Sequence, residues 1–274
     1  MATLDATVAV PRENSLSVLI PHTWVLTVRL LLRWSRDPLT VFQAIVLPAL
    51  FLVMIDVVLG KQITSYSQFS NPGYNALFGS VPMTMLLGVM SGSTAGAIAL
   101  GRERDDGLLS RFWVLPVHRA SGLLARIVAE LIRIVATTIV LLATGYVLGF
   151  RFEQGPVAAL AFLVVPLLFG VAFAVLVTAV AVISAKAALV EGVALISSLL
   201  MFFSTGFVPL QAFPEWVRPI VEHQPLSLTI EAMKGLSFGG PVQGPLLGSL
   251  AWSVGAIVVF AVPAVLGYQR ASRR

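Results

Sequence analysis

The chain has 274 residues, of which 57% are hydrophobic and only 11% are charged. Its mean hydropathy of +0.92 exceeds what a soluble domain of this length needs to fill one core, which favours lipid as its solvent. The absence of cysteine excludes disulfides, thiolate metal sites and cysteine nucleophiles, and the net charge of +5 comes mainly from arginine and does not indicate nucleic-acid binding.

The first 38 residues predict an amphipathic helix. They contain no apolar run before their arginines, so we do not expect a cleavable signal peptide. Arg29, Arg33 and Arg36 fall on one helical face and Trp24 on another, so the segment is expected to lie flat on the membrane. Pro38 marks the turn into the first membrane span.

Six apolar runs follow, each about as long as the roughly 20 residues that a helix needs to cross a bilayer. Their continuous apolarity favours helices over a β-barrel. We therefore predict an all-α integral membrane protein with one domain, residues 1–274: a cytoplasmic segment 1–38, a six-span region 39–268 and a tail 269–274. The predicted spans are Leu39–Gly60, Gly79–Leu100, Leu123–Gly149, Val157–Ile183, Leu189–Val208 and Leu246–Tyr268.

The distribution of Lys and Arg predicts the orientation. Thirteen basic residues fall in the termini and in the segments after the second and fourth spans, whereas four fall in the other loops. By the positive-inside rule, both termini and residues 101–122 are cytoplasmic, and residues 61–78 and 209–245 are external.

The stretch "RERDDGLLSRFWVLPVHRASGLLAR" concentrates charge between the second and third spans. Leu108, Phe112 and Leu115 recur at helical spacing, and Pro116 ends the short amphipathic helix that they predict. One interpretation is an anchor in the lipid headgroups. The acidic residues of "RERDD" instead favour a surface complementary to a protein partner.

Four prolines follow the fifth span, too closely spaced for one helix, and they predict several short helical pieces. These prolines are Pro209, Pro214, Pro219 and Pro225.

Three acidic residues, Asp56, Glu130 and Glu191, lie in or near the spans and are functional candidates by default. Arg133 follows Glu130 by three residues, so an internal ion pair is a sufficient explanation for that carboxylate. The small residues of the second span favour close helix packing, with a pathway-lining role as the alternative for Ser91, Ser93 and Thr94. The three histidines show no metal-ligand spacing, and no catalytic or cofactor-binding set appears.

Two stretches resemble the permeases of type-2 ABC exporters, most closely those for daunorubicin and doxorubicin resistance. The charged stretch matches the family pattern E-R-x-x-G followed by P-V-x-R, and "FFSTGFVPLQAFPEWVRPIVEHQPLSLTIEAMKGL" matches a second pattern, with Thr205 as an extra residue. The resemblance implies that the charged stretch is a coupling helix seated in a groove of an ATPase. It assigns this role to Arg102, Glu103, Arg104, Gly107, Leu108, Arg111, Pro116 and Arg119.

The resemblance further implies an N-terminal connecting helix, short re-entrant helices outside the last span, and a pathway along the second and fifth spans that includes Phe202, Phe203 and Ser204. Its expected partners are two ABC ATPase subunits, a second permease (a second copy or a paralogue), the bilayer and an amphiphilic substrate, in the inner (plasma) membrane of a bacterial cell. The chain contains no G-x-x-x-x-G-K-[ST] motif, so ATP and Mg are expected on the partner ATPase and not on this chain.

Two other functions stay open at this point. A proton-coupled secondary transporter would use Asp56, Glu130 or Glu191 as its relay, although no inverted repeat is evident. An intramembrane lipid-modifying enzyme would need clustered carboxylates or histidines, which the sequence does not show.

Overall fold

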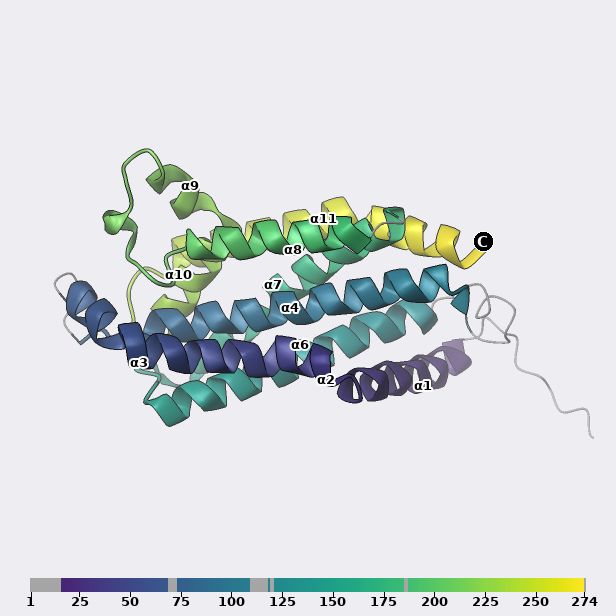
Figure 1. The fold of residues 1–274 in the computed structure, drawn as a ribbon, viewed down its shortest axis with the longest axis horizontal. Helices are drawn as coiled ribbons and strands as arrows, with labels where there is room; N and C mark the ends of the chain where they lie inside the picture. Colours follow the sequence, from purple (N-terminus) through teal and green to yellow (C-terminus); the bar gives the residue numbers. More distant parts are fainter. Residues whose placement is uncertain (1–15, 69–72, 109–117, 119–120, 185–186, 274) are drawn as a thin grey trace, which may run out of the picture.

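The computed structural model describes residues 16–68, 73–108, 118, 121–184 and 187–273, and within these ranges the chain is all-α, as predicted (Figure 1). The helices are α1 (Leu16–Ser35), α2 (Pro38–Val41), the π-helical turn η1 (Phe42–Val46), α3 (Leu47–Gln68), α4 (Leu77–Asp105), α6 (Ser121–Leu148), α7 (Gly155–Ile183), α8 (Ala187–Phe202), the 3-10 turn η2 (Leu210–Ala212), α9 (Arg218–His223), α10 (Pro225–Ser237) and α11 (Gln243–Arg273).

Five of the six predicted spans form helices long and apolar enough to cross a membrane, the first of them running continuously over Pro38–Ser65. The predicted fifth span differs, because α8 ends at Phe202 after 16 residues rather than continuing to Val208. There the Ser204 hydroxyl donates to the Met201 carbonyl at 2.6 Å. A Cβ at Gly206 would lie 2.8 Å from the Met83 sulfur, so the chain leaves the helix where it packs closely on α4.

Helix α4 is the centre of the bundle. An apolar 18-residue stretch of α4 is 67% buried inside the bundle, whereas the corresponding stretches of the other four long helices are 11–44% buried. Glycines allow the close packing around it: a Cβ at Gly88 would lie 2.8 Å from the Ala44 carbonyl oxygen in η1, and a Cβ at Gly170 of α7 would meet the Val89 side chain at 2.6 Å. These contacts place α3, α6 and α7 around α4 and bury the core on both sides of it.

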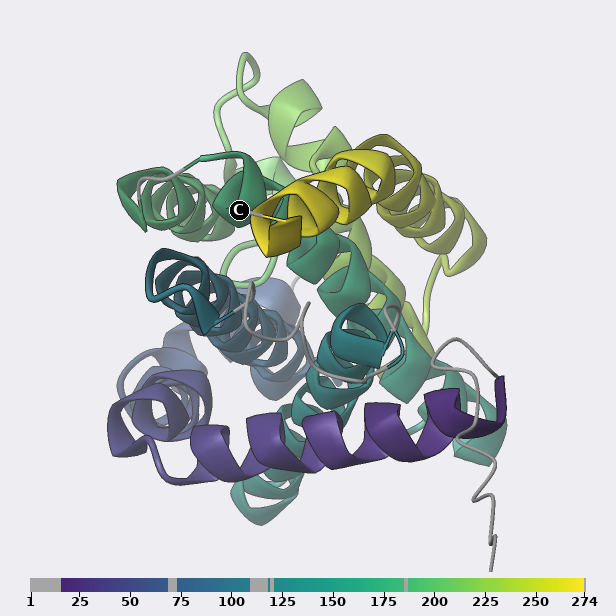
Figure 2. The ribbon, with the colours of Figure 1, turned by 90° about the vertical axis from the view of Figure 1, so that its right-hand side faces the viewer.

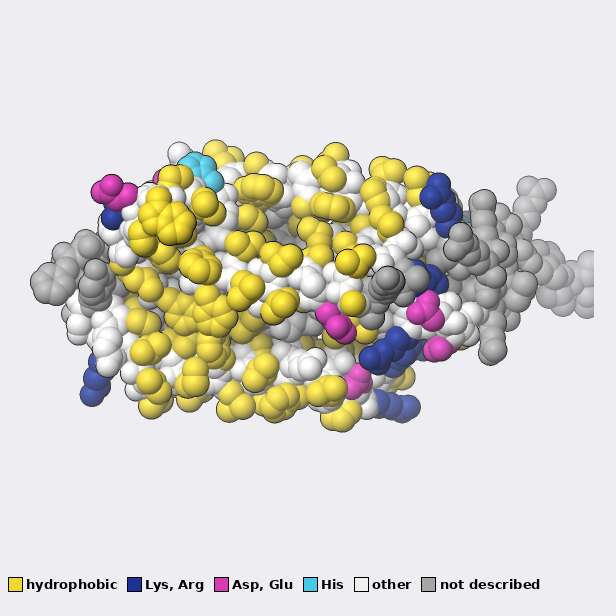
Figure 3. Space-filling model, turned by 45° about the horizontal axis from the view of Figure 1, so that its top comes forward, with side chains coloured by type: hydrophobic (Ala, Val, Ile, Leu, Met, Phe, Trp, Pro, Cys, Tyr) yellow, Lys and Arg dark blue, Asp and Glu magenta, His cyan; other side chains and the backbone are white. Residues whose placement is uncertain are grey.

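The outside of the bundle is apolar. Large aliphatic side chains such as Val57, Val147, Val157 and Val258 are 67–87% exposed, and Figure 3 shows hydrophobic side chains over the middle of the visible face, with charged ones toward the two ends. Water would disfavour so large an apolar surface, whereas the hydrocarbon of a bilayer matches it.

The two ends of the bundle hold different segments (Figure 1). Helix α1, the end of α4, the start of α6 and the C-terminal end of α11 lie at one end, which we call the α1 end; α9, α10 and the start of α4 lie at the other, the α9 end. This agrees with the predicted grouping of the segments by side. Which end faces the cytoplasm stays a prediction.

Helix α1 lies across the bundle instead of along it. Figure 2, viewed along the bundle, shows α1 at nearly full length while the long helices are foreshortened. Ile20, Trp24 and Val25 are 58–76% exposed on its outer face. Asp37 caps the next helix by accepting a hydrogen bond from the backbone N–H of Thr40 at 3.3 Å. The Thr40 hydroxyl donates to the other carboxylate oxygen at 2.7 Å, and the two bonds lower the pKa of Asp37. The predicted amphipathic helix and its turn at Pro38 are confirmed; its place on a membrane surface stays a prediction.

Candidate functional site

Glu103, in the last turn of α4, joins three helices through one carboxylate. The residue is 2% exposed. From α1, Arg29 Nη2 and Arg33 Nη1 lie 3.3 Å and 2.5 Å from its Oε1, and from α6 the Arg126 guanidinium is paired with its Oε2. We call these four residues the Glu103 cluster.

Local geometry explains how the cluster forms. Arg29 and Arg33 are four residues apart and so share one face of α1. Thr27, which is 0% exposed, holds that part of α1 against α6 and donates a 3.4 Å hydrogen bond to the Ala125 carbonyl. A buried carboxylate is tolerated only when paired, and here three guanidinium groups surround one negative charge.

The neighbouring Arg104 connects α4 to a fourth helix. Its guanidinium donates to the carbonyls of Ala181 at 3.1 Å and Ser184 at 3.0 Å, where α7 ends, and it pairs with Asp105 at 3.0 Å. A cation at a helix C-terminus satisfies carbonyls that have no partner within the helix and interacts favourably with the helix dipole. Glu103 and Arg104 together therefore tie the end of α4 to α1, α6 and α7.

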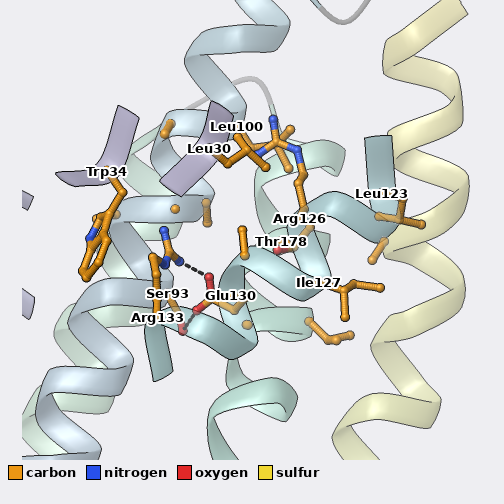
Figure 4. Close-up of a pocket in the computed structure, with 18 of the residues that line it drawn as sticks. Leu30, Trp34, Ser93, Leu100, Leu123, Arg126, Ile127, Glu130, Arg133 and Thr178 are labelled. Carbon is orange, nitrogen blue, oxygen red and sulfur yellow. Dashed lines mark hydrogen bonds and ion pairs between the residues drawn. The ribbon is translucent and has the colours of Figure 1, made fainter. Parts of the chain in front are cut away.

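A cavity of about 200 Å³ opens next to the cluster, between α1, α4, α6, α7 and α11 (Figure 4). Arg33, Trp34 and Asp37 border it from the α1 side, and Arg126 and Arg133 from α6. The wall that α7 and α11 supply is apolar except for Thr178, and consists of Val171, Ala174, Val175, Thr178, Ala261, Ala264 and Val265.

Glu130 and Arg133 form an ion pair in the wall of this cavity, which confirms the pairing expected from their spacing. The second carboxylate oxygen of Glu130 accepts a 2.5 Å hydrogen bond from Ser93 of α4, so both of its oxygens have partners. The Arg133 side chain is 13% exposed, and its guanidinium lies against Gly96, where a Cβ would come within 2.6 Å of Nη2. Gly96 thus makes room for the arginine between α4 and α6.

At the α9 end, α10 holds the chain that follows α8. Lys234 Nζ donates to the Thr205 carbonyl and to Glu231 at 2.9 Å, and Gln224 Nε2 donates to the Phe203 carbonyl at 2.6 Å. Tyr74 belongs to the same region, and burial raises the pKa of its hydroxyl although the charge of Lys234 opposes the shift. Lys234 and Gln224 thus donate to backbone carbonyls that have no partner within a helix, because α8 ends there.

The five predicted coupling residues that the structure describes all lie at the α1 end, in or just after the last turn of α4. Gly107 adopts a φ of +69°, in the left-handed region that suits glycine, just after α4 ends. Arg102 is exposed and Leu108 half-buried. The remaining members, Arg111, Pro116 and Arg119, lie outside the described residues, as do Phe112 and Leu115, so the helix predicted there stays a prediction.

The position of Glu103 differs from what a contact with a partner requires. Its side chain is 3% exposed and both carboxylate oxygens are engaged within the chain. A coupling role for this residue therefore has to act through the helices that it joins.

The predicted pathway residues do not gather in one place. Ser93 faces the cavity, whereas Thr94 donates to the Met90 carbonyl of its own helix and Ser91, half-buried, is not in the cavity wall. Phe202 and Phe203 are more than half exposed at the end of α8, and Ser204 is buried beside them. Their role in a pathway stays a prediction.

Sequence reasoning missed the partners of Glu103 and the role of Lys234. The sequence places Arg29 and Arg33 on one helical face and includes Arg126 among the basic residues that predict the topology, but it does not connect them with Glu103. Lys234 is distant in sequence from the Thr205 carbonyl, and no periodicity indicates that contact.

Comparisons with known proteins agree with this architecture. The profile of the ABC-2 type transporter family matches residues 21–238. The chain is 49% identical over 260 residues to the probable doxorubicin resistance ABC transporter permease protein DrrC of Mycobacterium tuberculosis, covering 95% of this chain and 92% of that protein. It is 24% identical over 255 residues to the daunorubicin resistance ABC transporter permease protein DrrB1 of Streptomyces coeruleorubidus, covering 91% and 85%.

Proposed function

Because the chain belongs to the ABC-2 type transporter family, we propose that it is the permease subunit of an ATP-driven exporter, which moves an amphiphilic drug, antibiotic or lipid-like molecule out of the cytoplasm or the inner leaflet. The observation that carries the proposal is the 49% identity, over 95% of the chain, to a permease named for doxorubicin resistance. Five long apolar helices and an apolar exterior support the membrane location.

Hydrolysis of ATP belongs, in this proposal, to separate ABC ATPase subunits that bind ATP and Mg, because this chain lacks the phosphate-binding motif. A second permease, either another copy or a paralogue, completes the transporter. Both termini face the cytoplasm of the bacterial cell, as the distribution of basic residues predicts.

The Glu103 cluster suggests how movement of the ATPase reaches the spans. The segment after α4 is the proposed coupling element, and Glu103 and Arg104 attach the end of α4 to α1, α6 and α7. A push on this segment therefore moves four helices together, as alternation between inward-facing and outward-facing packings requires. One buried carboxylate with three arginines provides that connection.

The structure favours this mechanism over a proton-coupled transporter. Both carboxylate oxygens of Glu130 are engaged, Glu191 is exposed at the start of α8, and Asp56 is half-buried on α3, so the three carboxylates form no relay. An enzyme acting in the membrane finds no support either, since the residues that the structure describes hold no cluster of three or more His, Asp or Glu that could bind a metal.

The proposal is tested with inside-out vesicles that contain the chain and its ATPase, using the fluorescence of doxorubicin to follow uptake. We expect uptake that needs ATP and is insensitive to a protonophore. The control is the same vesicle with an ATPase whose phosphate-binding lysine is replaced. Uptake driven by a proton gradient without ATP would show that the chain is a secondary transporter.

A further inference from the structure

The cavity beside the Glu103 cluster has two chemically different halves. The half between α1 and α6 carries Arg33, Arg126 and Arg133, and the half formed by α7 and α11 is almost wholly apolar. Figure 4 shows Arg126, Glu130 and Arg133 projecting from α6, and Leu123 and Ile127 on the side of α11. A molecule that fills both halves must have an acceptor-rich head and an apolar chain.

The polar half has more hydrogen-bond donors than acceptors. A guanidinium has five N–H groups. Arg33, Arg126 and Arg133 each donate through a single nitrogen, to Glu103 or Glu130, in the part of the chain that the structure describes. One of these guanidinium donors, Arg133 Nε, is buried and has no acceptor among the described residues, and the same is true of Trp34 Nε1 in this wall.

The charges of the residues around the cavity also favour an anionic head. Arg33 and Arg126, which both border the cavity, share the single negative charge of Glu103, whereas Glu130 and Arg133 neutralise each other. Asp37 at the rim is exposed, and Thr40 already donates to it. The region therefore favours an anion with several oxygen acceptors, and a phosphate group fits that description.

The apolar half is accessible from the surrounding lipid. Helices α6 and α11 both pack against α7 but make little contact with each other. At the α1 end the gap is closed, since a Cβ at Gly122 of α6 would lie 2.6 Å from the Tyr268 hydroxyl oxygen of α11. Farther along, Ile127 of α6 and Val262 of α11 are 43% and 61% exposed. An acyl chain can thus enter between these helices with its head at the arginines.

We propose that this cavity binds one anionic phospholipid of the inner leaflet, with its phosphate at Arg33, Arg126 and Arg133 and an acyl chain along α7 and α11. The cavity volume of about 200 Å³ is below the roughly 300–1,000 Å³ of pockets that enclose a drug-sized molecule, so the site holds the head and part of one acyl chain, and the rest of the lipid stays in the bilayer. The lipid links α1 to α6, α7 and α11 at the place where the Glu103 cluster fixes α4. The proposal requires only that the chain spans a membrane, and it holds whether or not the chain exports a drug.

Trp34 provides the reporter for a direct test. The other four of the five tryptophans are replaced by phenylalanine, and the chain is placed in lipid nanodiscs. Phosphatidylglycerol with acyl chains brominated near the headgroup end is then titrated against phosphatidylcholine brominated in the same way. We expect brominated phosphatidylglycerol to saturate the quenching of Trp34 at a mole fraction at least about fivefold lower than brominated phosphatidylcholine does. One basic residue near a membrane surface contributes roughly that preference for an anionic lipid.

Two variants with matched controls locate the site. Ala174→Phe fills the apolar half, and Arg33→Gln removes a headgroup contact; both are expected to abolish the preference for phosphatidylglycerol. The controls are Val164→Phe, at a 58% exposed position of α7 outside the cavity, and Arg36→Gln, at an exposed arginine that does not border it. Helical circular dichroism and elution volume verify that each variant is folded.

The proposal is overturned if both brominated lipids quench Trp34 equally, because Trp34 then contacts bulk lipid only. It is also overturned if the folded Ala174→Phe variant keeps the full preference for phosphatidylglycerol, because the acyl chain of the lipid then lies elsewhere. Failure of the parent chain and its ATPase to transport the drug, with the lipid preference intact, would count against the proposed function and leave the lipid site standing.

Discussion

Replacing Glu103 by glutamine should release α1 from the bundle. Glutamine keeps the shape of the side chain and one acceptor oxygen, but it removes the negative charge that three arginines share. Arg126 is affected most, because its side chain is only 17% exposed, whereas Arg29 and Arg33 are 36% and 48% exposed.

The magnitude follows from these exposures. Removing one partner of a buried ion pair costs about 3–5 kcal/mol, and the amide oxygen retained by glutamine reduces this to about 2 kcal/mol for Arg126. The two more exposed arginines add about 0.5 kcal/mol each, because solvent screens them. Only Arg29 and Arg33 belong to α1, so docking of α1 should weaken by about 1 kcal/mol, which corresponds to about a fivefold larger open population. The cost at Arg126 falls on the contact between α4 and α6.

A single cysteine measures this opening. The chain has no cysteine, and Thr27, which is 0% exposed in α1, lies against α6, so Thr27→Cys reacts with a maleimide only when α1 moves away. If α1 opens and closes faster than the thiol reacts, Glu103→Gln should accelerate this labelling about fivefold. A cysteine at the exposed Ser35 gives the rate for an accessible thiol and should be unaffected.

The matched control is Asp105→Asn. Asp105 pairs with Arg104 but its side chain is 59% exposed, so its loss should change the labelling rate by less than about threefold. Equal labelling rates in the parent, Glu103→Gln and Asp105→Asn proteins would refute the conclusion that the Glu103 cluster holds α1.

Three further predictions concern other parts of the chain. Gly96→Ala should lower the thermal midpoint of unfolding by displacing Arg133, at a cost of about 1–3 kcal/mol, whereas Gly101→Ala, where a Cβ meets nothing within 4 Å, should be neutral or stabilising; equal effects would contradict the packing argument. Lys234→Met should speed hydrogen exchange of the amides of residues 203–210, because it removes the donor to the Thr205 carbonyl. If exchange is no faster than in the control Lys61→Met, at an exposed lysine, then α10 does not hold this segment. A cysteine at Gln68 should be labelled only from outside the cell and one at Asp106 only from the cytoplasm; the reverse pattern would invert the predicted topology.

The sequence alone was sufficient to predict that the protein lies in lipid, that its fold is all-α and where most of its spans lie. In hydrocarbon each backbone group has to be bonded within its own helix, so a long apolar run in this chain has essentially one available structure. Local signals were also reliable: a new helix begins at Pro38, and Glu130 pairs with Arg133 one turn away. Each of these depends on residues within about one helical turn.

Tertiary structure decided what joins distant segments. The sequence placed Glu103 on a surface for a partner, and only the packing of α1, α4 and α6 brings it to arginines 23, 70 and 74 residues away. Likewise, α8 stops at Phe202 because Gly206 packs on Met83 and Lys234 holds the Thr205 carbonyl, and hydropathy reports neither contact. The cavity beside the cluster exists because Ala174 and Ala264 stay small where α7 and α11 meet, which hydropathy along a single helix does not show.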